Sequence, residues 1–179
     1  KVITFSRVYP SYHPRKGEIT GFPEKFLRSM NIEYNYCVNE HSTHSFWSLN
    51  RGKEKEVEDF ISFKFSDPFD YKPKPHTIRA GHRFKREDVA SIRVWSDRPY
   101  NSKQIRIAPD VKVRTWDFDM INGKIIINGL FHCGIKDHEK VTEFAQNDGL
   151  SWLDFIDWFK YPKPITDHQI ICWKQDFKY

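Results

Sequence analysis

The sequence predicts an α+β fold built on a small, mixed, barrel-like β-sheet. Short runs of β-branched and aromatic residues recur after residue 75, and turn-forming pairs separate them. Stretches with apolar residues at three- and four-residue spacing lie before and after these runs, as amphipathic helices require. The chain has 179 residues, of which 39% are hydrophobic, enough for one domain with a sizeable core. We therefore expect residues 1–179 to form a single α+β domain.

The N-terminal part is expected to hold one strand and two helices. β-branched and aromatic residues close together favour a short strand at residues 2–8. Pro23 suits the first turn of a helix over residues 23–30. Residues 35–53 are polar and irregular, which indicates a long surface excursion. Apolar residues at helical spacing predict a second amphipathic helix over residues 53–65.

The C-terminal part changes to short strands with one further helix. Asn122-Gly123 between two apolar runs indicates a β-hairpin. Ser151 with Asp154 three residues later resembles a capping box and starts a helix over residues 152–159. The expected strands lie at residues 76–79, 89–95, 103–108, 111–118, 124–128 and 170–173.

The charge of the chain is concentrated in one segment. The whole chain has 29 Lys and Arg against 24 Asp and Glu, a formal net charge of +5. Residues 72–114 alone hold 12 basic and 4 acidic residues, so this segment is the first candidate for contact with a polyanion. Aromatic residues make up 16% of the chain, enough to fill a small core and leave rings for ligand contact. The chain has no Gly-rich phosphate loop, which argues against nucleotide hydrolysis.

Cysteine and histidine spacing predicts neither disulfides nor a metal site. The three cysteines are an odd number with no Cys-x-x-Cys pair, which favours reduced thiols in a cytoplasmic protein. His41 and His44 lack further ligands at a usual zinc spacing. No apolar run approaches the length of a membrane span, and the first residues look like a strand rather than a signal peptide. We expect a soluble, cytoplasmic chain with no metal, no cofactor and no membrane partner.

The densest cluster of reactive side chains follows two prolines, in Lys72-Pro73-Lys74-Pro75-His76-Thr77-Ile78-Arg79. Alternate residues of a strand share a face, so Thr77 and Arg79 point the same way and Lys74 reaches toward that face. Such a set binds a phosphate or a polarised carbonyl, and a desolvated lysine beside an arginine becomes a useful base. His82 and Arg83, after Gly81, are candidates for anion binding at a turn. The alternative is a solvated basic edge strand.

A second cluster combines rings with basic residues between Arg93 and Gln104. Trp95 and Tyr100 are candidates for base stacking, and Arg98 and Lys103 are candidates for phosphate contacts. The alternative is that Trp95 belongs to the core of a strand and hairpin.

These residues resemble the ASCH domains of the PUA-like superfamily. Ile3-Thr4-Phe5 and Lys74-x-x-Thr77-Ile78-Arg79 are similar to the opening strand and the motif of the small members that deacetylate N-acetylated cytidine. The segment 145–151 is similar to the segment before a helix in which those enzymes carry an acidic residue, and it places Asp148 there. The resemblance implies a PUA-like fold in which residues 9–71 form a large insertion of helices and loops after the first strand.

The resemblance also implies a chemistry. Lys74 would deprotonate Thr77, the Thr77 hydroxyl would attack the acyl carbon, and Asp148 would protonate the departing amine. Arg79 would hold a phosphate or the oxyanion. The expected partner is RNA or a nucleoside or nucleotide ligand. Two alternatives stay open, a non-catalytic RNA-binding module and a protein-interaction domain that acts through residues 9–71. The sequence leaves the oligomeric state open.

Overall fold

The computed structural model describes residues 1–43, 45–63, 65–97 and 99–179. Its secondary structure confirms the α+β class, because the described residues form two β-sheets and six α-helices. The predicted barrel is not formed, since neither sheet closes on itself within the described residues. Two compact units share the chain. Unit 1 contains Lys1–Tyr9, Gly17–Pro73 and Val89–Val111, and unit 2 contains Pro10–Lys16, Lys74–Asp88 and Lys112–Tyr179.

The sheet of unit 1 is built on a parallel pair of strands. β1 (Val2–Phe5) pairs with β3 (Val89–Trp95), and β4 (Gln104–Arg106) continues the sheet on the other side of β3. The short strand β5 (Val111–Lys112) also pairs with β3. Every second residue of β3 is buried, which is the alternation that the sequence shows. The predicted strands near 2–8, 89–95 and 103–108 are thus confirmed in shorter or equal form.

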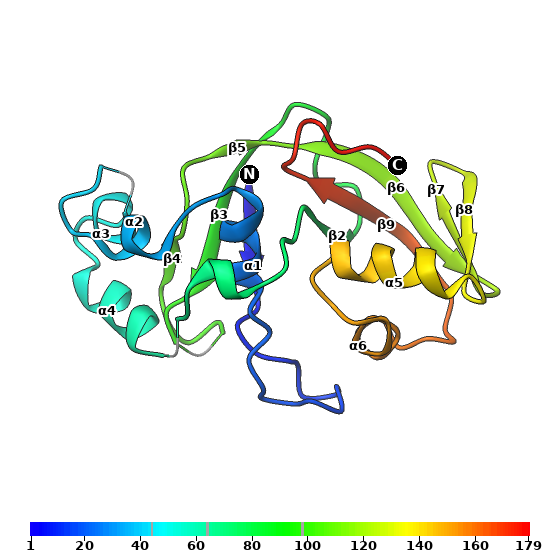
Figure 1. Ribbon diagram of the computed structural model, residues 1–179, viewed down its shortest axis with the longest axis horizontal. Helices are drawn as coiled ribbons and strands as arrows, with labels where there is room; N and C mark the ends of the chain where they lie inside the picture. Colours follow the sequence, from blue (N-terminus) through cyan, green and yellow to red (C-terminus); the bar gives the residue numbers. More distant parts are fainter. Residues whose placement is uncertain (44, 64, 98) are drawn as a thin grey trace. The chain divides into compact units, whose positions relative to one another are not determined.

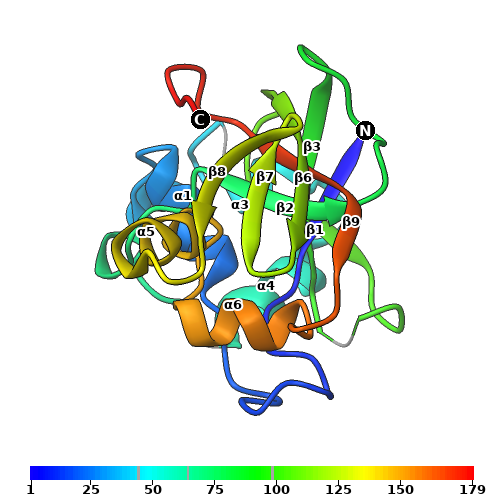
Figure 2. The same ribbon diagram turned by 90° about the vertical axis from the view of Figure 1, so that its right-hand side faces the viewer.

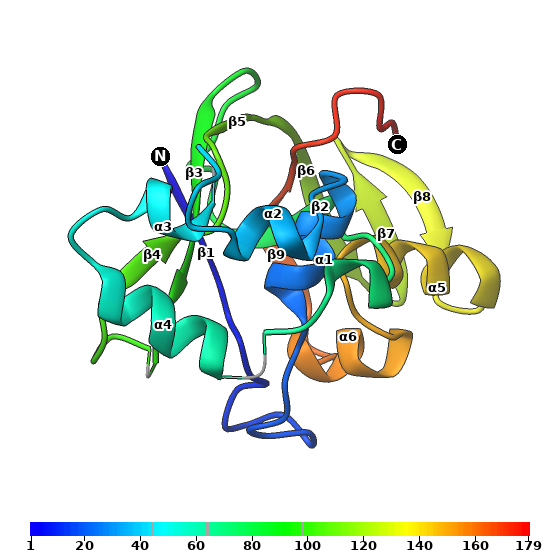
Figure 3. The same ribbon diagram turned by 60° about the vertical axis from the view of Figure 1, so that its left-hand side comes forward.

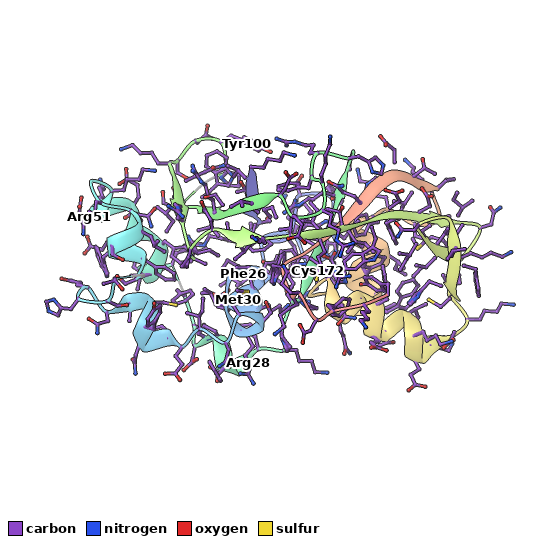
Figure 4. All side chains as sticks on the ribbon, turned by 90° about the horizontal axis from the view of Figure 1, so that it is seen from above. Phe26, Arg28, Met30, Arg51, Tyr100 and Cys172 are labelled. Carbon is purple, nitrogen blue, oxygen red and sulfur yellow. The ribbon has the colours of Figure 1, made fainter. Side chains whose placement is uncertain are left out.

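Helix α1 (Phe22–Ser29) confirms the predicted helix over 23–30. Pro23 occupies its first turn, where a missing N–H costs nothing. Gly21 precedes the helix with a φ of 66°, and a Cβ there would lie 2.6 Å from the Tyr71 ring, so only glycine fits. Figure 4 shows Phe26 and Arg28 on opposite sides of α1, and Phe26 is fully buried. An amphipathic face therefore anchors the helix in unit 1.

The polar segment 35–53 is not a simple surface excursion. It forms α2 (Tyr34–Val38) and α3 (Phe46–Leu49), and Phe46 is fully buried against Phe60 and Phe65 at ring-centroid distances of 5.3 and 5.1 Å. One buried aromatic residue in a polar stretch gives no periodic signal, which is why the sequence did not indicate these helices. The next elements are α4 (Glu54–Ser62), as predicted, and the 3-10 turn η1 (Pro68–Asp70). Figure 3 shows α3 and α4 beside β4.

The sheet of unit 2 has five strands in the order β2-β9-β6-β7-β8, and all neighbours are antiparallel (Figures 1 and 2). Asn122 and Gly123 both have positive φ and join β6 to β7 as the predicted hairpin. The single strand expected over 111–118 is wrong, because the structure has two strands there. β5 ends before Val113 and β6 begins after it. The bounds are β2 (His76–Ala80), β6 (Arg114–Ile121), β7 (Lys124–Ile127), β8 (Leu130–Gly134) and β9 (Ile165–Cys172).

Two helices contact each other in unit 2. The first, α5 (His138–Asn147), was not predicted, and it also contacts β8. The second, α6 (Trp152–Trp158), starts at Ser151, whose hydroxyl accepts the Asp154 N–H as the capping box predicts. Phe144 and Phe155 are fully buried between the helices, with ring centroids 5.7 Å apart.

Residues 9–71, the insertion implied by the resemblance, do not form one body. Residues 10–16 belong to unit 2, where Arg15 donates to the Asp154 carboxylate at 2.9 Å, and residues 17–71 belong to unit 1. The extent of the insertion relative to compact relatives stays a prediction. Within the described residues, no helix is long and apolar enough to cross a membrane.

Candidate functional site

A buried ion pair joins two residues that the resemblance selects. The Lys74 ammonium lies 2.6 Å from Oδ1 of Asp148, although 74 positions separate the two residues. It also donates to the Asp148 backbone carbonyl. The Lys74 side chain is 1% exposed and that of Asp148 is 5% exposed. Charged side chains are rarely this buried unless they are paired, so the two positions depend on each other.

Local sequence places both partners. Pro73 and Pro75 flank Lys74 and favour an extended chain that leads into β2. Asp148 closes α5, and Gly149 follows with a φ of 80°, a left-handed conformation that turns the chain toward the cap of α6. β2 is the edge strand of its sheet, and the Ile78 N–H donates to Oδ1 of Asp148 at 3.2 Å. The Asp148 carboxylate, in the short connection between α5 and α6, thus accepts a hydrogen bond from a backbone N–H of the edge strand β2.

Burial and neighbouring charges have opposite effects on the pKa of the Asp148 carboxyl. Burial raises the pKa of the Asp148 carboxyl, while the nearby charges of Lys74 and Arg79 and the Ile78 N–H lower it. Burial is the largest of these effects because a carboxylate loses its hydration there. A proton shared between a buried amine and a buried carboxyl can rest on either one, so the pair has the components of both a base and an acid.

Thr77 and Arg79 share one face of β2, as alternation along the strand predicts. In the register with β9, Thr77 lies opposite Ile171 and Arg79 lies opposite Gln169. Thr77 is buried, and its hydroxyl makes no hydrogen bond with any residue that the structure describes. Arg79 is half-buried, and its charge acts on Asp148. Lys74 and Asp148 are thus in direct contact, and the charge of Arg79 acts on Asp148. Thr77 shares the strand face with Arg79 but makes no hydrogen bond with the pair in the described residues.

His76 is a functional candidate that the sequence reasoning did not single out. It is fully buried, its Nε2 bonds with the Tyr179 hydroxyl, and its Nδ1 has no hydrogen-bond partner among the described residues. Burial lowers the pKa of His76 well below 6.5, and the charge of Lys74 lowers it further. The ring is therefore neutral at pH 7. The available signal was the position of His76 inside the motif, between Lys74 and Thr77.

A cavity of about 210 Å³ lies in unit 2 beside the His76–Tyr179 contact. It combines rings with two lysines, one glutamate and one asparagine, a composition suited to a planar ligand with polar substituents. The lining residues are His132, Lys140, Glu143, Phe144, Asn147, Phe177, Lys178 and Tyr179. None of them was predicted as a site residue, because β8 and α5 were not recognised in the sequence.

The two candidates at the turn after β2 lie in a different setting. His82 is partly exposed and lies 3.2 Å from a carboxylate oxygen of Asp117 and 3.3 Å from one of Asp167. Two carboxylates around an imidazole attract a cation and disfavour an anion. Arg83 is exposed. The structure thus gives His82 acidic partners in place of the expected anion.

The predicted aromatic and basic cluster belongs to unit 1. Trp95 and Tyr100 have ring centroids 5.3 Å apart, and Tyr100 is 87% exposed, at the edge of the view in Figure 4. Lys103 forms an ion pair with Glu56 at 2.7 Å. Trp95 also lines a cavity of about 120 Å³, together with Phe5, Arg7, Val8, Phe63, Asp97 and Pro99. The predicted contacts are therefore divided between two units.

The predicted phosphate contact Arg98 lies outside the described residues, as does His44, for which no metal site was predicted. Among the residues that the structure does describe, no group of three or more His, Cys, Asp or Glu side chains is arranged to hold a metal ion. Comparison of the chain with protein-family models, with curated proteins and with solved structures finds no match. The likeness to ASCH domains therefore stays a prediction from the motif.

Proposed function

We propose that the chain is a PUA-like ASCH protein that recognises a nucleobase, nucleoside or RNA segment through unit 2. The observation that supports this most strongly is the buried Lys74–Asp148 pair. The two residues were selected from separate parts of the sequence by their likeness to one motif, and they lie 2.6 Å apart. The likeness to the motif thus coincides with a contact between residues that are distant in the sequence.

The surroundings of the pair suit a nucleic-acid ligand. Arg79 adds positive charge on β2, and Lys140 adds it at the cavity of about 210 Å³. Phe144, Phe177 and Tyr179 offer rings at the same cavity, and bases stack on such rings. A base held by stacking and a phosphate held by a cation is the usual division of contacts in RNA recognition.

We propose further that the same residues hydrolyse an N-acylated cytosine-type amide. Transfer of the Lys74 proton to Asp148 would leave a neutral amine and a carboxylic acid, a change that burial favours because it removes two charges. The amine would then take the Thr77 proton as the hydroxyl attacks the acyl carbon. The carboxylic acid would give its proton to the departing exocyclic amine, and water would release the acyl group from Thr77.

The experiment is binding and turnover of 4-acetylcytidine by the purified protein, compared with Lys74→Ala and with Lys72→Ala. Lys72 is a matched control because it is an exposed lysine two residues away. We expect Lys74→Ala to abolish turnover and weaken binding, and Lys72→Ala to change neither. A wild-type protein that neither binds nor hydrolyses acylated nucleosides would refute the enzymatic proposal.

A second candidate function is RNA binding by unit 1 without catalysis. The exposed Tyr100 ring, which lies tilted beside Trp95, favours it, because single-stranded bases stack on such rings. This function predicts that binding of a single-stranded RNA oligonucleotide weakens steeply with salt and that Tyr100→Ala weakens it. An affinity that is indifferent both to salt and to Tyr100→Ala would exclude this candidate.

A further inference from the structure

The ring of the half-buried residue Tyr179 contacts five other rings of unit 2. Their centroids lie 5.1 to 5.6 Å from the Tyr179 centroid, and four of the five ring pairs are edge-on, at 5.1, 5.5, 5.5 and 5.6 Å. Such spacings are those at which aromatic pairs attract each other. We call these five rings the Tyr179 cage: His76, Trp116, His132, Phe144 and Phe177.

The cage comes from parts of the chain that are far apart in sequence. His76 lies on β2, Trp116 on β6, His132 on β8 and Phe144 on α5. Only Phe177 belongs to the same segment as Tyr179, after the end of β9. Four of the five cage rings therefore lie on helices or strands, whereas Tyr179 lies on an irregular segment.

One polar group lies at the inner end of the cage. The Tyr179 hydroxyl bonds with Nε2 of His76, and Nδ1 of the same buried ring has no hydrogen-bond partner among the described residues. The neutral His76 ring has one nitrogen that donates and one that accepts a hydrogen bond. It can therefore bond with either a donor or an acceptor group in the plane of a bound ring. Burial raises the pKa of the Tyr179 hydroxyl well above 10, so the occupant is uncharged.

The cage opens onto the cavity of about 210 Å³. Three rings of the cage, His132, Phe144 and Phe177, also line this cavity, together with Tyr179 itself and Lys140. A ligand whose ring replaced that of Tyr179 would find room beside it for a sugar or another substituent. The Lys140 ammonium would attract a negative group on that substituent.

We propose that the Tyr179 cage is a binding site for a planar six-membered ring with an in-plane hydrogen-bonding group, and that Tyr179 occupies it in the free protein. A ligand binds by displacing Tyr179, which acts as an internal competitor. The identity of the ring rests on the proposed function, under which it is a pyrimidine nucleobase. Internal competition lowers the apparent affinity by the fraction of molecules in which the cage is empty.

The test measures binding of cytidine and of p-cresol to the wild type, to Tyr179→Ala and to the control Tyr12→Ala. p-Cresol reproduces the tyrosine side chain, and emptied apolar cavities of ring size do bind small aromatic molecules. Tyr12 is a partly exposed tyrosine of unit 2 that lies outside the cage. We expect Tyr179→Ala to bind cytidine about tenfold more tightly than the wild type, since it no longer has to break a buried hydrogen bond and ring contacts. Tyr12→Ala should bind like the wild type.

A second measurement does not depend on the folding of Tyr179→Ala. The Tyr179 ring signal in the NMR spectrum of the wild type, assigned by its absence from Tyr179→Phe, should move to the position of a solvated tyrosine when cytidine is added. Cytidine binding that leaves this signal unchanged would overturn the inference and leave the proposed function intact. Binding of p-cresol but not cytidine to Tyr179→Ala would support the cage and refute nucleoside recognition. A folded Tyr179→Ala that binds neither probe would overturn the cage.

Discussion

Replacing Asp148 with alanine should destabilise unit 2 strongly. The Lys74 ammonium, 1% exposed, would keep the backbone carbonyl of residue 148 as an acceptor but lose the carboxylate 2.6 Å away. The Ile78 N–H would lose its partner as well. Removing one partner of a buried pair typically costs about 3–5 kcal/mol, because the remaining charge is buried without compensation. We expect Asp148→Ala to lower the free energy of unfolding by about 4 kcal/mol.

The assay is urea-induced unfolding at pH 7, followed by tryptophan fluorescence. Lys140→Ala is a control in the same unit, because Lys140 pairs with Asp137 at 3.4 Å with both side chains well exposed. Exposed pairs contribute at most about 1 kcal/mol. The double variant Lys74→Met/Asp148→Asn should recover most of the loss, since it removes both buried charges and keeps the side-chain volumes nearly unchanged. A loss for Asp148→Ala no larger than that for Lys140→Ala would refute a buried pair.

Three further predictions concern single side chains. Burial holds His76 neutral in the folded chain. Below pH 6.5 the unfolded chain therefore binds a proton that the folded chain does not. The free energy of unfolding should then fall by up to about 1.4 kcal/mol for each unit that the pH is lowered. His76→Gln should flatten this dependence in urea unfolding between pH 7 and 5, and His82→Gln should not; equal slopes in both variants would contradict the assignment. Tyr179→Phe removes the hydroxyl bonded to His76 and should cost about 1 kcal/mol in the same assay, whereas no loss would mean that the bond is not formed. Tyr100→Ala should change stability by less than about 0.5 kcal/mol because the ring is exposed, and a larger change would show that the ring packs in the folded protein.

Elements with a strong local pattern were predictable from the sequence. β3 alternates buried and exposed residues, and α1 carries its apolar residues at helical spacing after a proline. The hairpin at Asn122-Gly123 requires positive φ at both residues, which is what the pair favours. Which strands pair was not predictable, because β2 joins β9 and β1 joins β3 over long sequence separations. The prediction of a barrel was wrong for this reason, because closure of a sheet depends on which strands pair and not on strand propensity.

The candidate site was predictable in part, and through the motif rather than through periodicity. Nothing in the local pattern near Asp148 distinguishes a buried carboxylate from an ordinary helix cap. The contiguous basic segment 72–114 divides between the two units, so charge along the chain did not mark one surface. His132 and Tyr179 were missed because β8 is short and lacks alternation, and because the segment after β9 has no regular structure.

The most direct test of the central claim is an NMR titration of the isotopically labelled protein with cytidine. The account predicts chemical-shift changes concentrated on β2, on the α5–α6 connection around Asp148 and on Tyr179, and their loss in Lys74→Ala. Changes confined to Trp95 and Tyr100, or changes in unit 2 that persist unaltered in Lys74→Ala, would contradict it.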